Sequence, residues 1–248
     1  MSESDFCDKL ITTTDFKDKK FSQMNYDFVY FTLMSTQGIK CKGLYMLDMI
    51  DKAAGIAGLR GLIVNYRSSS TNPVKNKKQA DDLNLARNKW KHLNHCKCIS
   101  KCLTTESVCA SMKAAKFVLF PNTADASPRL IVEALVRGRP VLVNKNIYGG
   151  WKYINEYTGE FFNAPSFKEY RNCDLNSYIN SLSESMKSIM KMDSEKVKEA
   201  YYNEYGFLNT SKRLAGIINQ ITGEKYDLVC FKEWRNVLKG VAKNEGFI

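Results

Sequence analysis

Residues 116–150, KFVLFPNTADASPRLIVEALVRGRPVLVNKNIYGG, constrain the fold more than any other part of the chain. Phe117–Phe120 and Pro140–Val143 are short apolar runs rich in β-branched and aromatic residues, which is typical of buried strands. Between them, apolar residues recur with helical spacing, after an N-cap at Ser127 and a proline, Pro128, suited to the first helical position. The stretch therefore predicts a β–α–β unit. The start of its helix faces the loop where α/β sheets bind ligands.

Two acids could give this unit its chemistry. Asp125 lies in the loop before the helix, and Glu133 follows eight residues later, inside the second helical turn. Backbone amides at a helix start can bind a diphosphate, and a carboxylate further along can accept hydrogen bonds from ribose hydroxyls. Taken alone, each acid is more simply interpreted as a solvated surface group. The ligand hypothesis therefore depends on the neighbouring sequence.

That neighbouring sequence resembles a known signature. Asp125-Ala-Ser-Pro-Arg-Leu-Ile-Val-Glu133-Ala, followed by Gly-Arg-Pro-Val and Gly149-Gly150, is similar to the acid-x7-Glu motif of GT-B glycosyltransferases, family 4 in particular. The usual family form is Glu-Gly-Phe-Pro, four residues, Glu-Ala, then Gly-x-Pro-Val and a Gly-Gly turn. The spacing from proline to the second acid matches. The departures are Asp125 in place of Glu and Ala126-Ser127 in place of Gly-Phe, all in the sugar-binding half of the motif.

A second match to the same family lies after the first expected strand, 27–33, and the loop with Gly38 that we expect to follow that strand. The pair Lys42-Gly43 resembles the Lys-Gly helix start of family 4, where an arginine and the lysine clamp the donor diphosphate. The arginine position falls near Thr32–Leu33, so the arginine is absent, and Lys40 is a candidate replacement. A solvated lysine before a helix explains this motif equally well.

The resemblance implies transfer of a sugar from a nucleotide-diphosphate sugar to a hydroxyl acceptor, with retention of configuration and without a metal or other cofactor. Asp125 would bind the transferred sugar, and Lys42 would stabilise the leaving diphosphate. Glu133 would hold the ribose. The remaining donor-binding candidates are Lys40, Ala126, Ser127, Arg129, Leu130 and Ile131.

The order of patterns predicts a single Rossmann-like α/β domain over 26–224, a parallel sheet flanked by helices, which resembles the C-terminal half of a GT-B glycosyltransferase. An N-terminal arm (1–25) and a C-terminal helical tail (225–248) would flank it. Further strands are expected at 59–66 and 98–103, and a short one near 158–162. Helices are expected from Lys42-Gly43 to residue 54, and at 79–93, 104–115, 151–156, 175–190, 197–205 and 210–221, the last with Leu214, Ile217, Ile218 and Ile221 facing inward.

The length of 248 residues is short for a two-domain GT-B enzyme, so we expect the acceptor domain to be absent. A partner subunit could supply it, or a homodimer could complete the site. Alternatively, the protein could bind nucleotide-sugars without transferring them.

The net charge of +11 favours anionic partners and leaves nucleic acid open as an alternative. Basic residues between Lys75 and Lys101 support a nucleic-acid or scaffold function, but the aromatic residues near them resemble core rather than stacking platforms. His92, His95, Cys96, Cys98 and Cys102 cluster in sequence, yet without the spacing of structural zinc sites. Neither a signal peptide nor a transmembrane helix is expected, so we predict a cytoplasmic protein with reduced thiols.

Overall fold

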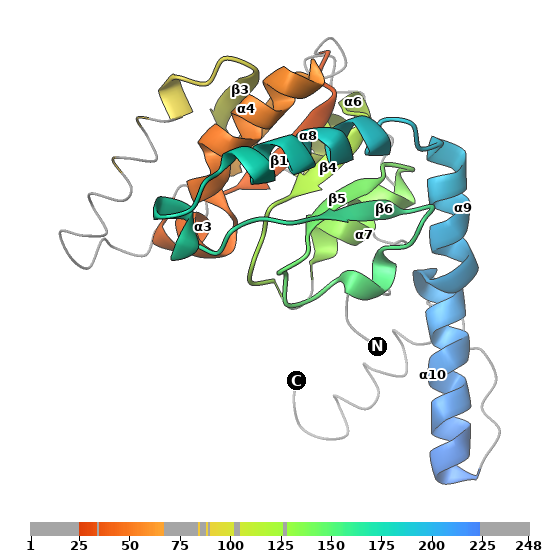
Figure 1. Ribbon diagram of the computed structural model, residues 1–248. Coiled ribbons are helices and arrows are strands. Elements are labelled where there is room, and N and C mark those ends of the chain that lie inside the picture. The colour runs from red at the N-terminus through yellow and green to blue at the C-terminus, as the bar shows by residue number, and fades with distance from the viewer. Residues whose placement is uncertain are drawn as a thin grey trace.

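The strands of the computed structural model form one parallel sheet in the order β3-β2-β1-β4-β5-β6 (Figure 1). The structure describes residues 25–33, 35–66, 84, 88, 90–101, 105–125 and 128–223. The strand order reverses between β1 and β4, and such a reversal point is where open α/β sheets commonly bind ligands. The strands are β1 (Phe28–Thr32), β2 (Gly61–Tyr66), β3 (Cys96–Lys101), β4 (Phe117–Phe120), β5 (Val141–Asn144) and β6 (Gly159–Phe162).

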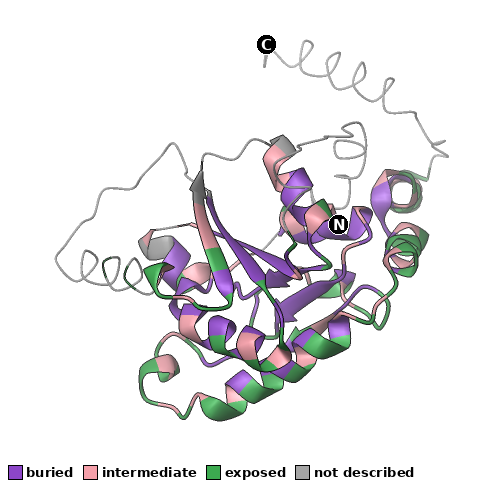
Figure 2. Ribbon diagram, turned by 90° about the horizontal axis from the view of Figure 1, so that it is seen from above, coloured by how far each residue is buried: buried purple, intermediate pink, exposed green. Residues whose placement is uncertain are grey.

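Helices cover both faces of this sheet, and their outer surfaces are exposed (Figure 2). Side chains of α3 (Thr36–Cys41), α4 (Leu47–Ala57) and α8 (Asn176–Ile189) join the apolar cluster on one face. Side chains of α6 (Thr105–Ala114), α7 (Arg129–Val136) and α9 (Ser194–Glu204) join the cluster on the other. The remaining elements are α10 (Gly206–Thr222) and the short 3-10 helices η2 (Leu44–Met46), η3 (Trp151–Tyr153) and η4 (Glu169–Arg171).

The central strands are buried on both faces, which explains their continuous apolar sequences. Every residue of β1, β4 and β5 is buried. Along β1, Phe28 and Tyr30 enter one cluster, whereas Val29 and Phe31 enter the other. The predicted parallel sheet and the β–α–β unit are both confirmed.

Three predicted boundaries are wrong. The third strand lies two residues earlier than 98–103. The region around Gly38, expected as a loop, forms α3, where the Ser35 hydroxyl accepts a hydrogen bond of 3.0 Å from the Gly38 amide and caps the helix. A Cβ on Gly38 would lie 1.5 Å from the Leu33 carbonyl oxygen, so the glycine marks a close backbone approach within a helix. The helix expected to begin at Lys42-Gly43 forms as η2 followed by α4.

The later helices also differ from expectation. Helix α7 begins at Arg129 with Pro128 as its N-cap, and only the turn η3 forms within 151–156. Helix α10 begins at Gly206, and its expected inward face is wrong because Ile217 and Ile221 are 45% and 78% exposed.

Several predicted segments cannot be compared with the structure. Residues 1–24 of the arm, the tail, the basic residues at 75–78 and most of the helix at 79–93 lie outside the described residues. Across the described ranges, no helix combines the length and hydropathy needed to cross a membrane.

A buried carboxylate fixes the beginning of β3. Asp51 on α4 is 5% exposed and accepts hydrogen bonds from the backbone amides of Asn94, His95 and Cys96, at 3.0, 2.8 and 2.8 Å. Hydrogen bonds to an ionised acceptor are stronger than neutral ones. Asp51 therefore ties an edge strand of the sheet to the helix that covers it.

We expect Asp51→Asn to lower the free energy of unfolding by about 2–3 kcal/mol, because an amide replaces the charged acceptor of three backbone donors, of which the Cys96 amide is buried. Urea denaturation measures this change. The matched control is Lys52→Gln at the exposed neighbouring position, which should change stability by less than about 0.5 kcal/mol. Equal stability of the two variants would contradict the anchoring function of Asp51.

Candidate functional site

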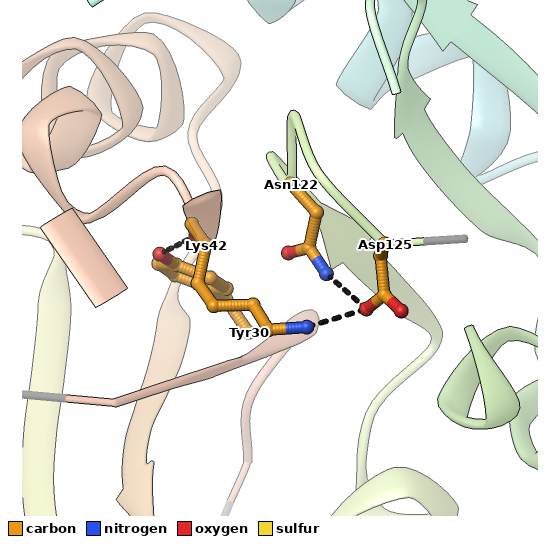
Figure 3. A network of polar contacts seen from close by, with 4 residues as sticks. All are labelled: Tyr30, Lys42, Asn122 and Asp125. Atoms are coloured by element: carbon orange, nitrogen blue, oxygen red, sulfur yellow. Dashed lines mark hydrogen bonds and ion pairs between the residues drawn. The ribbon is translucent and has the colours of Figure 1, made fainter. Parts of the chain in front are cut away.

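Lys42 and Asp125 meet at the reversal point of the sheet (Figure 3). The ammonium Nζ of Lys42 lies 2.5 Å from Oδ2 of Asp125, and Nδ2 of Asn122 donates to the same oxygen at 3.0 Å. The side chains of the ion pair are 20% and 21% exposed, so both charges remain in reach of solvent. A pair of this exposure contributes about 0.2–1 kcal/mol to stability, too little to explain the fold. Its main consequence is to place a cation and a carboxylate together at the edge where open α/β sheets commonly bind ligands.

Backbone contacts hold the two charged loops together. The amide of Thr123 donates to the carbonyl of Cys41 at 2.9 Å, and its hydroxyl donates to the carbonyl of Lys40 at 2.9 Å. Gly43 has a φ of 73°, and a Cβ there would lie 2.5 Å from the carbonyl oxygen of Pro121. Only glycine combines this conformation with so close an approach. The loop after β1 is therefore fixed against the loop after β4.

Sequence reasoning missed the residues that support the pair. The Tyr30 hydroxyl donates to the backbone carbonyl of Lys42, and Asn122 bonds directly to Asp125. Asn144 donates from Nδ2 to the Pro121 carbonyl at 3.4 Å. The available signal was a polar residue at or just after the carboxyl end of a buried apolar strand: Thr32, Asn122 and Asn144 each hold that position and are at most 3% exposed.

Thr32 is the exceptional member of this set. It is fully buried at the carboxyl end of β1, and its hydroxyl has no hydrogen-bond partner among the described residues. Buried hydroxyls in folded proteins are usually paired, so the Thr32 hydroxyl is unusual among the polar groups at this edge of the sheet. This hydroxyl lies on the same face of β1 as Tyr30, two residues away.

The Gly-Gly turn seats against the beginning of α7. Gly150 has a φ of 87°, and a Cβ there would lie 2.6 Å from Cγ of Pro128 and 3.0 Å from Cδ1 of Ile131. Gly149 is buried beside it. The motif's two glycines therefore allow the loop after β5 to reach the helix start that follows β4.

Glu133 occupies a half-buried position in the second turn of α7. Burial raises the pKa of its carboxyl, and the positive charges of Arg137 and Arg129 act in the opposite direction. Arg137 also donates to the backbone carbonyl of Glu133 at 2.6 Å and contacts Sγ of Cys109 on α6. No described hydrogen bond or ion pair joins Glu133 to Lys42 or Asp125, so the structure does not bring the two halves of the acidic motif into direct contact.

The other candidate residues are distributed around this site. The Lys40 ammonium lies 5.9 Å from the ring centroid of Phe167 and so packs elsewhere than Lys42. The Arg129 side chain is exposed, and the Ile131 amide donates to the Pro128 carbonyl at 3.0 Å within the first helical turn. Leu130 is half-buried on α7. Ala126 and Ser127 lie outside the described residues.

The histidines and cysteines around β3 have separate surroundings. His92 and His95 are exposed, whereas Cys96 is buried and Cys98 half-buried. Burial, reinforced by the nearby Asp51 carboxylate, raises the pKa of both thiols. No group of acids, histidines and cysteines within the described ranges could hold a metal ion, and Cys102 lies outside those ranges.

Comparison with solved structures identifies the fold. A glycosyltransferase from Rickettsia africae ESF-5 matches with a TM-score of 0.56 and 12% identity, over 86% of this chain and 55% of that one. A UDP-forming α,α-trehalose-phosphate synthase from Burkholderia xenovorans matches with a TM-score of 0.54 and 6% identity, over 79% of this chain and 44% of that one. The GtfA/B complex matches with a TM-score of 0.55 and 13% identity, over 81% of this chain and 37% of that one.

These matches confirm the expected fold class. No protein-family model matches the sequence, and no curated protein is similar to it in sequence. The chain spans about half the length of the first solved chain and less of the other two. A parallel sheet covered by helices, with a long C-terminal helix, is the fold of one half of a GT-B glycosyltransferase.

We expect Gly150→Ala to lower the free energy of unfolding by about 1–3 kcal/mol, because the added methyl meets Pro128 and the φ is left-handed. Chemical denaturation provides the measurement. Gly216→Ala is the control: it lies within α10 with nothing within 4 Å of the added Cβ, and should be neutral or stabilising by about 1 kcal/mol. A neutral Gly150→Ala would mean that the turn does not seat on α7.

The raised pKa of Glu133 predicts a pH-dependent gain from Glu133→Gln. The native carboxyl holds its proton more tightly than the unfolded chain, whose pKa is near 4.5, so the wild type loses stability as pH rises through this window. The variant should therefore be more stable than the wild type at about pH 7, and the difference should shrink as pH falls towards 4.5. Urea denaturation of wild type and variant at several pH values in this range measures the difference in the free energy of unfolding. Glu199→Gln, at an exposed site on α9, is the control and should show no such pH dependence. A pH-independent difference would contradict the burial of Glu133.

Proposed function

We propose that this protein binds a nucleotide-diphosphate sugar and transfers its sugar to a hydroxyl acceptor. The observation that carries the proposal is the Lys42–Asp125 pair at the sheet reversal between β1 and β4. A diphosphate needs a cation, and a sugar needs hydrogen-bond acceptors for its hydroxyls. Both groups are available within 2.5 Å of each other.

Sugar transfer requires that the departing nucleoside diphosphate be stabilised. The bond between the anomeric carbon and the diphosphate oxygen breaks, the acceptor oxygen bonds to that carbon, and the acceptor's hydroxyl proton passes to the departing diphosphate, on which negative charge builds. The Lys42 ammonium and the positive end of α7 would stabilise that charge, with the Arg129 and Leu130 amides as donors. In this arrangement Asp125 accepts hydrogen bonds from sugar hydroxyls, and Glu133 accepts them from the ribose. Retention without a metal is the outcome that the resemblance to family 4 implies.

Donor binding would redistribute the pairing of Lys42. In the described structure its ammonium bonds to Asp125, and a bound diphosphate would compete for the same donor. The Asn122 amide continues to hold Asp125 Oδ2 when Lys42 turns to the phosphates, so the carboxylate keeps one fixed partner. The pair therefore supports a site that is preorganised and still able to exchange partners.

The acceptor is proposed to bind partly outside this chain. The solved chains with the same fold are longer, and this chain matches 37–55% of their length in the three comparisons described above. A partner subunit or a second copy would then supply the remaining acceptor surface. One alternative is binding of nucleotide-sugars without transfer, for which the Lys42–Asp125 pair alone would be enough.

A panel of UDP, GDP, ADP and TDP sugars tests the proposal. Thermal stabilisation by one nucleotide class identifies the donor base, since a ligand that binds the native state raises its apparent stability. Release of the free nucleotide during incubation with a hydroxyl acceptor distinguishes transfer from binding alone. Salt-sensitive retention on DNA without any nucleotide response would instead favour the nucleic-acid alternative.

We expect Lys42→Met to weaken binding of the preferred nucleoside diphosphate by about 10–100-fold, the loss typical of a charge-assisted hydrogen bond. Isothermal titration calorimetry measures the affinity. Lys187→Met is a matched control because Lys187 also forms an ion pair, with Glu184 at 2.9 Å, on the surface of α8. Equal affinities in wild type and Lys42→Met would refute the phosphate function of Lys42.

A further inference from the structure

Two large aromatic side chains are exposed on the loop that follows β5. Tyr148 is 75% exposed and Trp151 is 55% exposed, and they flank Gly149-Gly150. We propose that these rings form a stacking platform for the pyranose ring of the donor. This inference rests on the proposed function and extends it to residues outside the acidic motif.

The loop presents these rings from a fixed backbone. Asn146 donates from Nδ2 to the Ala164 carbonyl at 3.0 Å, and its amide donates to Oδ1 of Asn144 at 3.1 Å. The amide of Ile147, which is 2% exposed, donates to the Asn144 carbonyl at 3.0 Å. The indole Nε1 of Trp151 donates to the Ile147 carbonyl. The exposure of the aromatic rings is therefore a property of an ordered loop.

The platform adjoins the place where the diphosphate would bind. Gly150 lies against Pro128 and Ile131 at the beginning of α7. Tyr148 is two residues before this contact, and Trp151 is the next residue after it. The sugar is attached directly to the diphosphate, so it would leave the helix start within reach of this loop.

A pyranose ring fits the chemistry of this surface. One face of a pyranose carries C–H groups, which pack on the electron-rich face of an aromatic ring while the hydroxyls remain solvated. Tyrosine and tryptophan provide such area with few rotatable bonds, so little entropy is lost on binding. The exposed side chains of Lys145 and Asn146 lie on the same loop and can donate hydrogen bonds to sugar hydroxyls.

The test compares a nucleotide with its sugar conjugate in wild type and Tyr148→Ala. The probes are UDP with UDP-glucose and GDP with GDP-mannose, measured by calorimetry on the full chain. For the pair that binds, the wild type should hold the sugar conjugate about tenfold more tightly than the nucleotide, comparable to a base stacked on an aromatic ring. Tyr148→Ala should reduce this preference to about threefold or less, because half of the platform is lost while Trp151 and Asp125 remain, and should leave affinity for the bare nucleotide within about twofold. Tyr157→Ala, an equally simple change at a 52% exposed tyrosine before β6, should preserve the preference.

Fluorescence supplies a second readout. The chain contains three tryptophans, so a variant is needed to assign a change in their fluorescence. If the sugar conjugate quenches tryptophan fluorescence in wild type but not in Trp151→Phe, the quenched residue is Trp151. Nucleotide binding without a sugar preference, or with a preference that is the same in Tyr148→Ala as in wild type, would overturn the platform and leave the proposed function intact. If no nucleotide binds, the donor site and the platform both fail. A third outcome is that the wild type shows no sugar preference but co-sediments with phosphatidylserine vesicles, and that Tyr148→Ala does not co-sediment. This result would replace the platform by a membrane contact.

Discussion

The contact between the loops that follow β1 and β4 determines where the charges of the candidate site lie. Gly43 approaches the Pro121 carbonyl so closely that no side chain fits between them, and Thr123 bonds to two carbonyls of the opposite loop. Lys42 and Asp125 thus reach each other although 83 residues separate them in sequence. Because they lie in segments that follow adjacent parallel strands, a change in the register of β1 against β4 would separate the cation from the carboxylate.

The sequence predicted the sheet more accurately than its surroundings. The strands Phe117–Phe120 and Val141–Asn144 are buried on both faces, and such strands have continuous apolar sequences that are recognisable without structural knowledge. Helix α3 was missed because Gly38 resembles a loop signal, whereas the reason for the glycine is the nearby Leu33 carbonyl. The inward face of α10 was wrong because helical periodicity identifies an apolar stripe and does not indicate what covers it.

The candidate site was predictable only in part, for a related reason. Lys42, Asp125 and Glu133 each belong to a local pattern similar to a known family, so they could be named from the sequence. Asn122 follows a buried strand, so its position could be recognised, but its bond to Asp125 and the bond of Tyr30 to the Lys42 carbonyl depend on the folded chain. Glu133 makes no described contact with the Lys42–Asp125 pair, because it lies in the second turn of α7. The spacing of the two acids therefore predicts the beginning of one helix, but it does not predict the different surroundings of Asp125 and Glu133.

The attachment of α10 has a mechanical consequence. In Figure 1 this helix extends away from the sheet, and its buried residues, Gly206, Thr210 and Ser211, lie near its beginning. Tyr205, at that end, donates its hydroxyl to the Lys152 carbonyl and packs on Tyr153, directly after the turn that seats on α7. A 17-residue helix is about 25 Å long, so a rotation of about 10° at its base displaces its tip by about 4 Å. The attached end of α10 thus lies beside the turn that contacts α7, near the candidate donor site. A small rotation at this end would produce a larger displacement at the other end of the helix.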